Sequence, residues 1–249
     1  MGNPIPPVGD RPLEAPPILH EDSELLIVDK PSGMVVHPAY KHPDNTLADA
    51  VFARQAACNQ PRPWLLHRLD RDTSGVVVFA KTVGARRHLV RQFELRTVDK
   101  RYLAIVSGLL DPASGLIDAP LQRDPTNRRR TLVTAEGQPA QTWYQVLATE
   151  GNYSLVLAIP RTGRTHQLRA HLSSLGAPVV GDICYDEQHE QSAVIAPRVM
   201  LHAWQFACTH PLTRLPFRIT APLPPDMRLC MGVLKLGAGF ECLTGAMNT

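Results

Sequence analysis

The chain has 249 residues, of which 44% are hydrophobic and 20% are charged, so its composition is that of an ordinary globular protein and not of a disordered one. No apolar run approaches the roughly 18 residues that a membrane-spanning helix needs, so we expect no membrane partner. The formal net charge of +3 permits an anionic partner, and the position of the charges must decide whether one is expected.

The N-terminal 17 residues contain six prolines and no apolar segment, which predicts a flexible leader over residues 1–17 and excludes a signal peptide. The five cysteines are odd in number, widely spaced and form no CxxC pair, so they indicate a reduced, cytoplasmic protein without a cysteine metal site. Ordered structure is expected from residue 18 onward.

The first half predicts two strands and two helices. An apolar run over residues 24–28 is typical of a strand, and it ends at the turn residues Lys30-Pro31-Ser32-Gly33. Helical spacing of apolar residues predicts a helix over 46–57. A second strand is expected over 76–80, and Thr82 is placed to cap a helix that follows it.

The second half is rich in predicted strands, over residues 100–106, 142–148, 153–159, 200–208 and 217–220. One helix interrupts them, because Leu168, Leu172 and Leu175 share a face and Gly176 suits its C-terminal cap. The pattern predicts an α+β fold with a mostly antiparallel mixed sheet and flanking helices. We expect one catalytic domain over residues 18–232 and a loosely ordered tail over 233–249.

Three basic stretches stand out in this nearly neutral chain, at residues 86–101, 123–130 and 161–171. Arginine exceeds lysine in them, which suits bidentate contacts with phosphate. Each stretch alone is equally well explained as solvated surface. Together they could line one positive groove, for which nucleic acid is the natural polyanion.

The segment from His67 to Gly75 combines a histidine, an arginine and a carboxylate directly before an apolar strand. Thr73-Ser74-Gly75 are typical turn residues, so a tight turn would hold Asp70 at the rim of the sheet. The alternative is an ordinary solvated turn aspartate. Asp72 is too close in sequence to act with Asp70 as a glycosidase pair, and we expect it to be solvated.

The segment from Arg161 to His171 is the second concentration of chemically active side chains. Arg169 lies beside the apolar stripe of the predicted helix, so it needs a partner if that helix packs. His166 and His171 are five residues apart and do not share a helix face, which argues against a metal site. Neither a G-x-S-x-G elbow nor a glycine-rich nucleotide loop occurs.

The chain resembles the RluA family of RNA pseudouridine synthases. The resemblance rests on His67-Arg68-Leu69-Asp70-x-x-Thr73-Ser74-Gly75, with other blocks in the expected order. These blocks are Val28-Asp29-Lys30-Pro31-Ser32-Gly33, Lys100-Arg101-Tyr102, Gly137-Gln138-Pro139-Ala140-Gln141-Thr142, Thr162-Gly163-Arg164-Thr165-His166-Gln167-Leu168-Arg169-x-His171, Pro178-Val179-Val180-Gly181-Asp182 and Leu201-His202-Ala203.

The resemblance implies the pseudouridine synthase fold, with a central RNA-binding cleft, and the isomerisation of uridine in RNA without a metal or an organic cofactor. It assigns Asp70 as the catalytic aspartate at the ribose anomeric centre and Arg169 as its ion-pair partner. Tyr102 corresponds to the tyrosine that stacks on the target base. Arg68 is the residue expected to brace the gap that an extruded base leaves. Other RNA contacts are expected from His67, Arg164, His166, Arg128, Arg129 and Arg130.

The short segment before residue 18 is similar to the compact type that lacks an N-terminal RNA-binding domain. The expected substrates are stem-loops of transfer RNA, large-subunit ribosomal RNA, or both, and the protein is expected to be a monomer. Two alternatives stay open. A catalytically inactive RNA-binding protein of this fold should have lost Asp70, Tyr102 or Arg169, and all three are present. A nucleoside or glycoside hydrolase would need a second placed carboxylate.

Overall fold

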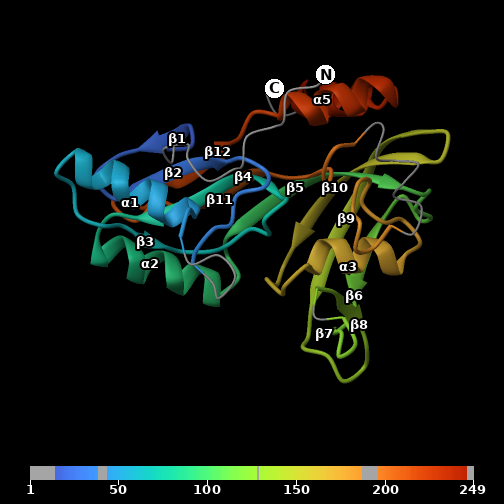
Figure 1. Ribbon diagram of the computed structural model, residues 1–249, viewed down its shortest axis with the longest axis horizontal. Coiled ribbons are helices and arrows are strands. Elements are labelled where there is room, and N and C mark those ends of the chain that lie inside the picture. The colour runs from blue at the N-terminus through green and yellow to red at the C-terminus, as the bar shows by residue number, and fades with distance from the viewer. Residues whose placement is uncertain (1–14, 39–43, 128, 187–195, 246–249) are drawn as a thin grey trace, which may run out of the picture.

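The computed structural model describes residues 15–38, 44–127, 129–186 and 196–245 (Figure 1). Its main feature is a ten-stranded mixed sheet in which every pairing except β4 with β11 is antiparallel. The strand order is β1 (Ile18–Glu21), β2 (Leu25–Lys30), β4 (Ser74–Ala80), β11 (Leu201–Thr209), β5 (Asp99–Ser107), β10 (Tyr153–Pro160), β9 (Gln141–Glu150) and β6 (Ser114–Asp118), with β3 (Trp64–Leu65) on β4 and β12 (Pro216–Thr220) on β11. The α+β class and the mostly antiparallel sheet are confirmed.

In the first half of the sheet, two helices cover opposite faces (Figure 1). Strand residues alternate between faces, so Leu26 of β2 packs with Leu47 of α1 (Leu47–Ala57), whereas Leu25 packs with Leu89 of α2 (Val83–Glu94). Both faces are therefore apolar, which explains the continuous apolar run of β2. The two helices begin at threonine caps, Thr46 for α1 and Thr82, as the sequence predicted, for α2.

The second half of the sheet packs against α3 (Gln167–Ser174), α5 (Pro225–Val233) and α6 (Gly237–Gly245). Residues 237–245 thus form a helix in a segment for which the sequence indicated loose order. The ring of Phe240 in α6 lies 5.8 Å from that of Trp204 in β11, and Leu236 is fully buried. Apolar packing by these side chains orders a segment whose three glycines had suggested a tail.

Strand β11 joins the two halves, because it lies between β4 and β5. Its junction with β4 is short and involves His202 with Ser74 and Ala203 with Gly75. Gly75 has φ +113°, and a Cβ atom there would lie 2.2 Å from the carbonyl oxygen of Ala203. Only glycine allows this approach, so the residue that follows the Asp70 turn fixes how closely the halves meet.

A separate two-stranded hairpin consists of β7 (Leu121–Arg123) and β8 (Thr131–Val133) and extends away from the main sheet near α3 (Figure 1). The sequence analysis identified its arginines but not its strands. In the part of the chain that the structure describes, no helix combines the length and apolar character needed to cross a membrane.

Candidate active site

A cleft of about 440 Å³ lies between the segment before β4 and the segment that leads into α3, with residues of β5 and β11 also in its walls. It brings together residues that are far apart in the sequence. Of the residues predicted for the site, it is lined by His67, Arg68, Asp70, Tyr102, Arg164, His166 and Arg169. The cleft is basic, since its other charged side chains are Arg96, Lys100 and Arg161, and Asp70 is the one carboxylate among the described residues that line it.

Backbone hydrogen bonds hold the turn that carries Asp70. The Thr73 amide donates to the Asp70 carbonyl at 3.2 Å, which closes the turn that the sequence predicted. The carbonyl of Arg71 accepts from the Gly33 amide at 2.9 Å and from Lys30 Nζ at 2.8 Å. Lys30 also donates to the carbonyls of Pro31 and Met34, so it joins the 30–34 turn to the Asp70 turn.

Lys30 is fully buried, and sequence reasoning did not give it a role. Burial lowers the pKa of its ammonium group to about 7, while the charges of Asp72 and Asp70 oppose that shift. Asp72 itself pairs with Arg71 at 3.0 Å, and its side chain is about one-third exposed. The buried Lys30 ammonium group thus stabilises the backbone of the Asp70 turn, whereas the side chain of Asp72 faces outward.

Arg169 lies close to Asp70, as the sequence predicted: its Nη1 is 3.6 Å from Asp70 Oδ2. Its nearer partner is Asp182, which accepts from Nε at 2.6 Å and from Nη2 at 2.7 Å. Asp182 is fully buried and follows Gly181, whose φ is +77°. In the sequence, Gly181-Asp182 stood out only as part of a block that matches the family. The sequence signal for a further partner was Arg169 itself, because a buried arginine needs a hydrogen-bonded counter-charge.

The arrangement keeps Arg169 charged. Burial alone would lower its pKa, but the hydrogen bonds and charge of Asp182, together with the charge of Asp70, raise it above the ordinary value. Asp182 fixes two of the guanidinium nitrogens, which leaves Nη1 directed to Asp70. The result is a permanent cation held beside the carboxylate in the cleft.

Tyr102 lies on β5, opposite Ala203 of β11 and Ala158 of β10. Burial and the nearby charge of Asp70 both raise the pKa of its phenol. The hydroxyl group is therefore neutral throughout the physiological pH range. The resemblance implies that Tyr102 stacks on the target base, and Tyr102 does line the cleft.

His67 and His166 differ in what surrounds them. Burial and the charge of Lys100 lower the pKa of His67 to about 3, and its Nε2 accepts the Val78 amide hydrogen. His67 is therefore neutral and forms part of the cleft wall. His166, the residue before α3, has φ +54° and places Nε2 4.0 Å from Asp70 Oδ1. Burial lowers its pKa, against the charge of Asp70.

The predicted arginine contacts are only partly brought together. Arg68 is exposed in the cleft, and Arg164 lines both the cleft and a neighbouring hollow of about 590 Å³. Arg123, from the β7–β8 hairpin, lines the same hollow. Arg129 is exposed at the hairpin, Arg130 is half-buried, and Arg128 lies outside the described residues.

The first basic stretch reaches the cleft only through Arg96 and Lys100. Arg86, Arg87 and Arg91 are exposed on α2 and do not line it. The expectation that all three basic stretches line one groove is therefore right for the third, partly right for the second, and wrong for most of the first. Helix α2 uses its apolar face for the core, which turns these arginines to solvent.

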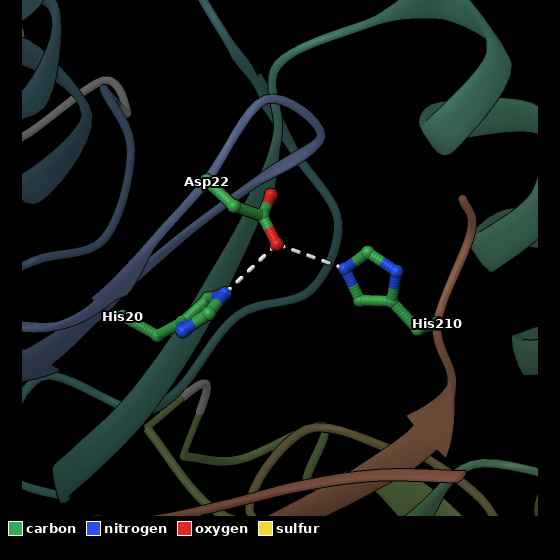
Figure 2. Close-up of side chains that lie close together, drawn as sticks. All are labelled: His20, Asp22 and His210. Atoms are coloured by element: carbon green, nitrogen blue, oxygen red, sulfur yellow. Dashed lines mark hydrogen bonds and ion pairs between the residues drawn. The ribbon is translucent and has the colours of Figure 1, made fainter. Parts of the chain in front are cut away.

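His20, Asp22 and His210 form a cluster (Figure 2), and none of them lines the cleft. Asp22 Oδ2 is 2.9 Å from Nε2 of each histidine. However, Nδ1 of His210 accepts the amide hydrogens of Leu212 and Thr213, so its Nε2 must carry the proton that Asp22 accepts. A metal-bound histidine has the opposite pattern, in which the second nitrogen donates. The cluster fits a hydrogen-bonded bridge between β1 and the end of β11, and it does not fit a metal ion.

Comparison with known proteins relates most of the chain to one family. A family model described as RNA pseudouridylate synthase matches residues 24–174. The ribosomal large subunit pseudouridine synthase D of Nitrosomonas europaea is 42% identical over 88% of this chain and 65% of its own length. The protein of that name from Xanthomonas campestris is 37% identical over 91% of this chain and 70% of its own. The chain thus spans about two-thirds of these relatives.

Two solved human structures have the same fold. Human RNA pseudouridylate synthase domain containing 4 superposes with a TM-score of 0.73 and 27% identity, covering 88% of this chain and 92% of that one. Human RNA pseudouridylate synthase domain containing 1 gives a TM-score of 0.72 and 29% identity, covering 90% of each. The sheet and its flanking helices therefore occur in relatives of low overall identity.

Proposed function

Because the chain belongs to the RNA pseudouridylate synthase family, we propose that it isomerises uridine to pseudouridine in RNA, with Asp70 as the catalytic residue. The observation that carries the proposal is the position of Asp70. Among the described residues of a basic cleft it is the one carboxylate, and it lies 3.6 Å from a guanidinium that Asp182 holds in place. The fixed guanidinium of Arg169 lies where it can pair with the Asp70 carboxylate.

The reaction is an exchange of bonds within one nucleotide. The bond from C1′ to N1 breaks, uracil turns in the site, and a bond forms from C1′ to C5. The C5 hydrogen leaves as a proton, and N1 gains one, so atoms balance without water. Asp70 acts at C1′, either by direct attack or by assisting elimination. A single carboxylate is enough, because nothing is hydrolysed.

Tyr102 and Arg169 complete the proposed catalytic set. Tyr102 presents its ring to the base, and its neutral hydroxyl group takes part in moving the C5 proton. Arg169 holds the charge of Asp70 in place. The neutral state of Tyr102 matters here, because a phenolate beside Asp70 would add a second negative charge to the cleft.

The cleft supports binding of one extruded nucleotide. Its volume of about 440 Å³ is in the usual range of single-ligand sites, roughly 300–1,000 Å³. A stacked uridine must therefore leave its helix, at a cost of a few kcal/mol. Arg68, exposed at the cleft, is the side chain proposed to brace the gap, and Arg164 and the β7–β8 hairpin would contact phosphates nearby.

Large-subunit ribosomal RNA is the proposed substrate. Relatives with 36–44% identity include several proteins named as ribosomal large subunit pseudouridine synthase D. The cleft and hairpin would act on a stem-loop of that RNA, and a transfer RNA stem-loop is the competing substrate.

The test is to map pseudouridine by carbodiimide treatment and primer extension in total RNA from cells with and without the gene. The purified protein is then incubated with unmodified large-subunit ribosomal RNA and, separately, with transfer RNA. We expect at least one position in the ribosomal RNA to lose its signal in the deletion strain and to regain it in vitro. A signal confined to transfer RNA would reassign the substrate, and an unchanged map would reject the enzyme proposal in favour of a non-catalytic RNA-binding protein.

A further inference from the structure

Tyr185 lies between the β7–β8 hairpin and the Asp70 cleft and contacts both. It is buried, with 6% of its surface exposed, and it follows Asp182 by three residues. Its amide donates to the Asp182 carbonyl at 3.1 Å, so the two side chains leave the same tight turn. One of them holds Arg169, and the other reaches the hairpin.

The Tyr185 hydroxyl group forms both of its strong hydrogen bonds with one residue of the hairpin. The Thr131 amide donates to it at 2.7 Å, and the hydroxyl donates to the Thr131 carbonyl at 3.1 Å. Thr131 begins β8 and directly follows Arg129 and Arg130. The hydroxyl group therefore fixes the backbone from which these arginines project.

The Tyr185 ring lies near two guanidinium groups. Cζ of Arg130 is 5.3 Å from the ring centroid, and Cζ of Arg169 is 5.1 Å from it. Both distances are within the range of cation–π attraction. A single ring thus contacts an arginine of the hairpin and the arginine that faces Asp70.

A second route from Tyr185 to Asp70 passes through His166. The Tyr185 hydroxyl group is 3.4 Å from Nδ1 of His166, whose Nε2 faces Asp70 Oδ1 at 4.0 Å. His166 also precedes α3, the helix that carries Arg169. Two neighbours of Asp70 therefore depend on the position of the same tyrosine.

We propose that Tyr185 is a positioning residue that couples phosphate binding by the β7–β8 hairpin to the arrangement of Arg169 and His166 around Asp70. The inference rests on the proposed function in that RNA is the ligand. An RNA stem that orders the hairpin arginines would tighten the Thr131 contact and, through the ring, the position of Arg169. Coupling of this kind is reciprocal, so loss of the tyrosine hydroxyl should weaken binding at the hairpin.

A double-mutant cycle tests the coupling. The variants are Tyr185→Phe, the pair Arg129→Ala with Arg130→Ala, and all three changes together. Their dissociation constants for a fluorescein-labelled RNA stem-loop are measured by anisotropy at one salt concentration. We expect Tyr185→Phe to weaken binding about 3–10-fold in the parent protein. In the background without Arg129 and Arg130, the same change should alter binding less than about 2-fold.

The control is Tyr144→Phe. Tyr144 is about equally buried, and its hydroxyl donates at 3.0 Å to the carbonyl of Pro112, which is not a residue of the hairpin. The Tyr144→Phe variant also loses a hydrogen bond from a tyrosine hydroxyl to a backbone carbonyl. Its RNA affinity should nevertheless stay within about 2-fold of the parent. A purely structural role for Tyr185 predicts that Tyr185→Phe weakens binding by the same factor with and without the hairpin arginines. That additive result would overturn the proposal.

Hydrogen exchange gives a direct second measurement. The Thr131 amide donates to the tyrosine oxygen, so Tyr185→Phe should accelerate its exchange, whereas Tyr144→Phe should not. Neither measurement requires turnover. An active parent with an additive cycle would reject the coupling alone, whereas an RNA-binding parent that forms no pseudouridine but shows the non-additive cycle would reject the proposed activity alone.

Discussion

Arg169 donates two hydrogen bonds to Asp182, at 2.6 and 2.7 Å, and this buried pair determines which guanidinium nitrogen faces Asp70. The two residues come from α3 and from the turn after Gly181. Both side chains are buried, so water cannot take the place of either partner. Asp70, which lines the cleft, therefore depends on a second carboxylate outside the cleft, Asp182, for the position of the arginine beside it.

Replacement of Asp70 by Asn should abolish pseudouridine formation and leave RNA affinity within a few-fold of the parent. The amide has nearly the same shape but lacks the charge that acts on the sugar, while affinity depends on arginine contacts elsewhere. Single-turnover assays and anisotropy titrations with the same RNA measure the two quantities. Measurable turnover by the purified variant would rule out Asp70 as the essential group.

Asp182→Asn should destabilise the protein by about 3–5 kcal/mol, because it leaves the Arg169 charge buried without its bidentate partner. We also expect a slower single-turnover rate at saturating RNA, since Arg169 is no longer held toward Asp70. Urea denaturation gives the free energy of unfolding.

The matched control for Asp182 is Asp226→Asn. Asp226 accepts two hydrogen bonds from Arg198, at 2.7 and 2.9 Å, but its side chain is about one-third exposed and it does not line the cleft. This variant should lose less stability than Asp182→Asn, because the side chain of Asp226 is partly solvated, and it should keep the parent turnover rate. Equal losses of rate in the two variants would argue against a specific role for Asp182.

Tyr102→Phe should lower the single-turnover rate about 100-fold or more while RNA affinity changes little, because the ring remains and only the proton-handling hydroxyl group is lost. Burial and Asp70 raise the pKa of this phenol, so the parent rate should show no loss from phenol ionisation up to pH 9. The test is a pH–rate profile for both proteins. A variant as fast as the parent would remove the hydroxyl group from the mechanism.

Joint replacement of Arg128, Arg129 and Arg130 by Ala should reduce the salt dependence of RNA binding by up to about two to three units of slope, since each phosphate contact contributes roughly 0.7–0.9. The apparent KM should rise, while single-turnover chemistry on saturating RNA is largely kept. Salt titrations of binding measure the slope.

The structure supplies a control of equal charge for the hairpin variant. Arg86, Arg87 and Arg91 are exposed on α2 and do not line the cleft, so their joint replacement by Ala should leave the slope close to that of the parent. If the α2 variant flattens the slope and the hairpin variant does not, the RNA lies across a different face from the one proposed.

Asp29→Asn should stabilise the protein at pH 8 and change little at pH 4. Burial raises the pKa of the Asp29 carboxyl group to about 6, so the folded state keeps a proton that the unfolded state releases above its ordinary value of 3.8. The parent therefore loses stability as the pH rises from about 4 to about 6, by up to about 3 kcal/mol, and the amide cannot titrate. Denaturation curves at the two pH values give the difference, and an equal effect at both would contradict the assignment.

Local pattern was enough to predict the Asp70 turn and the apolar strands, because turn residues and apolar runs act over a few positions. The resemblance added the pairing of Asp70 with Arg169, which no local rule contains. Asp182, Lys30 and Tyr185 were missed as site residues, since each acts through contacts that depend on the tertiary fold. The arginines of α2 were wrongly expected to line the groove for the same reason. The charges in a sequence do not show which face of a helix packs against the core.

The central place of β11 has a consequence for how the protein acquires activity during its synthesis. The turn of Asp70 belongs to the half of the sheet that ends at β4, and Arg169 belongs to the half that starts at β5. A nascent chain that has not yet exposed residues 201–209 lacks the strand between them. Both parts of the cleft then exist outside the ribosome without a fixed distance between them. The two parts of the cleft should therefore reach their working arrangement only after residues 201–209 have left the ribosome and β11 has formed.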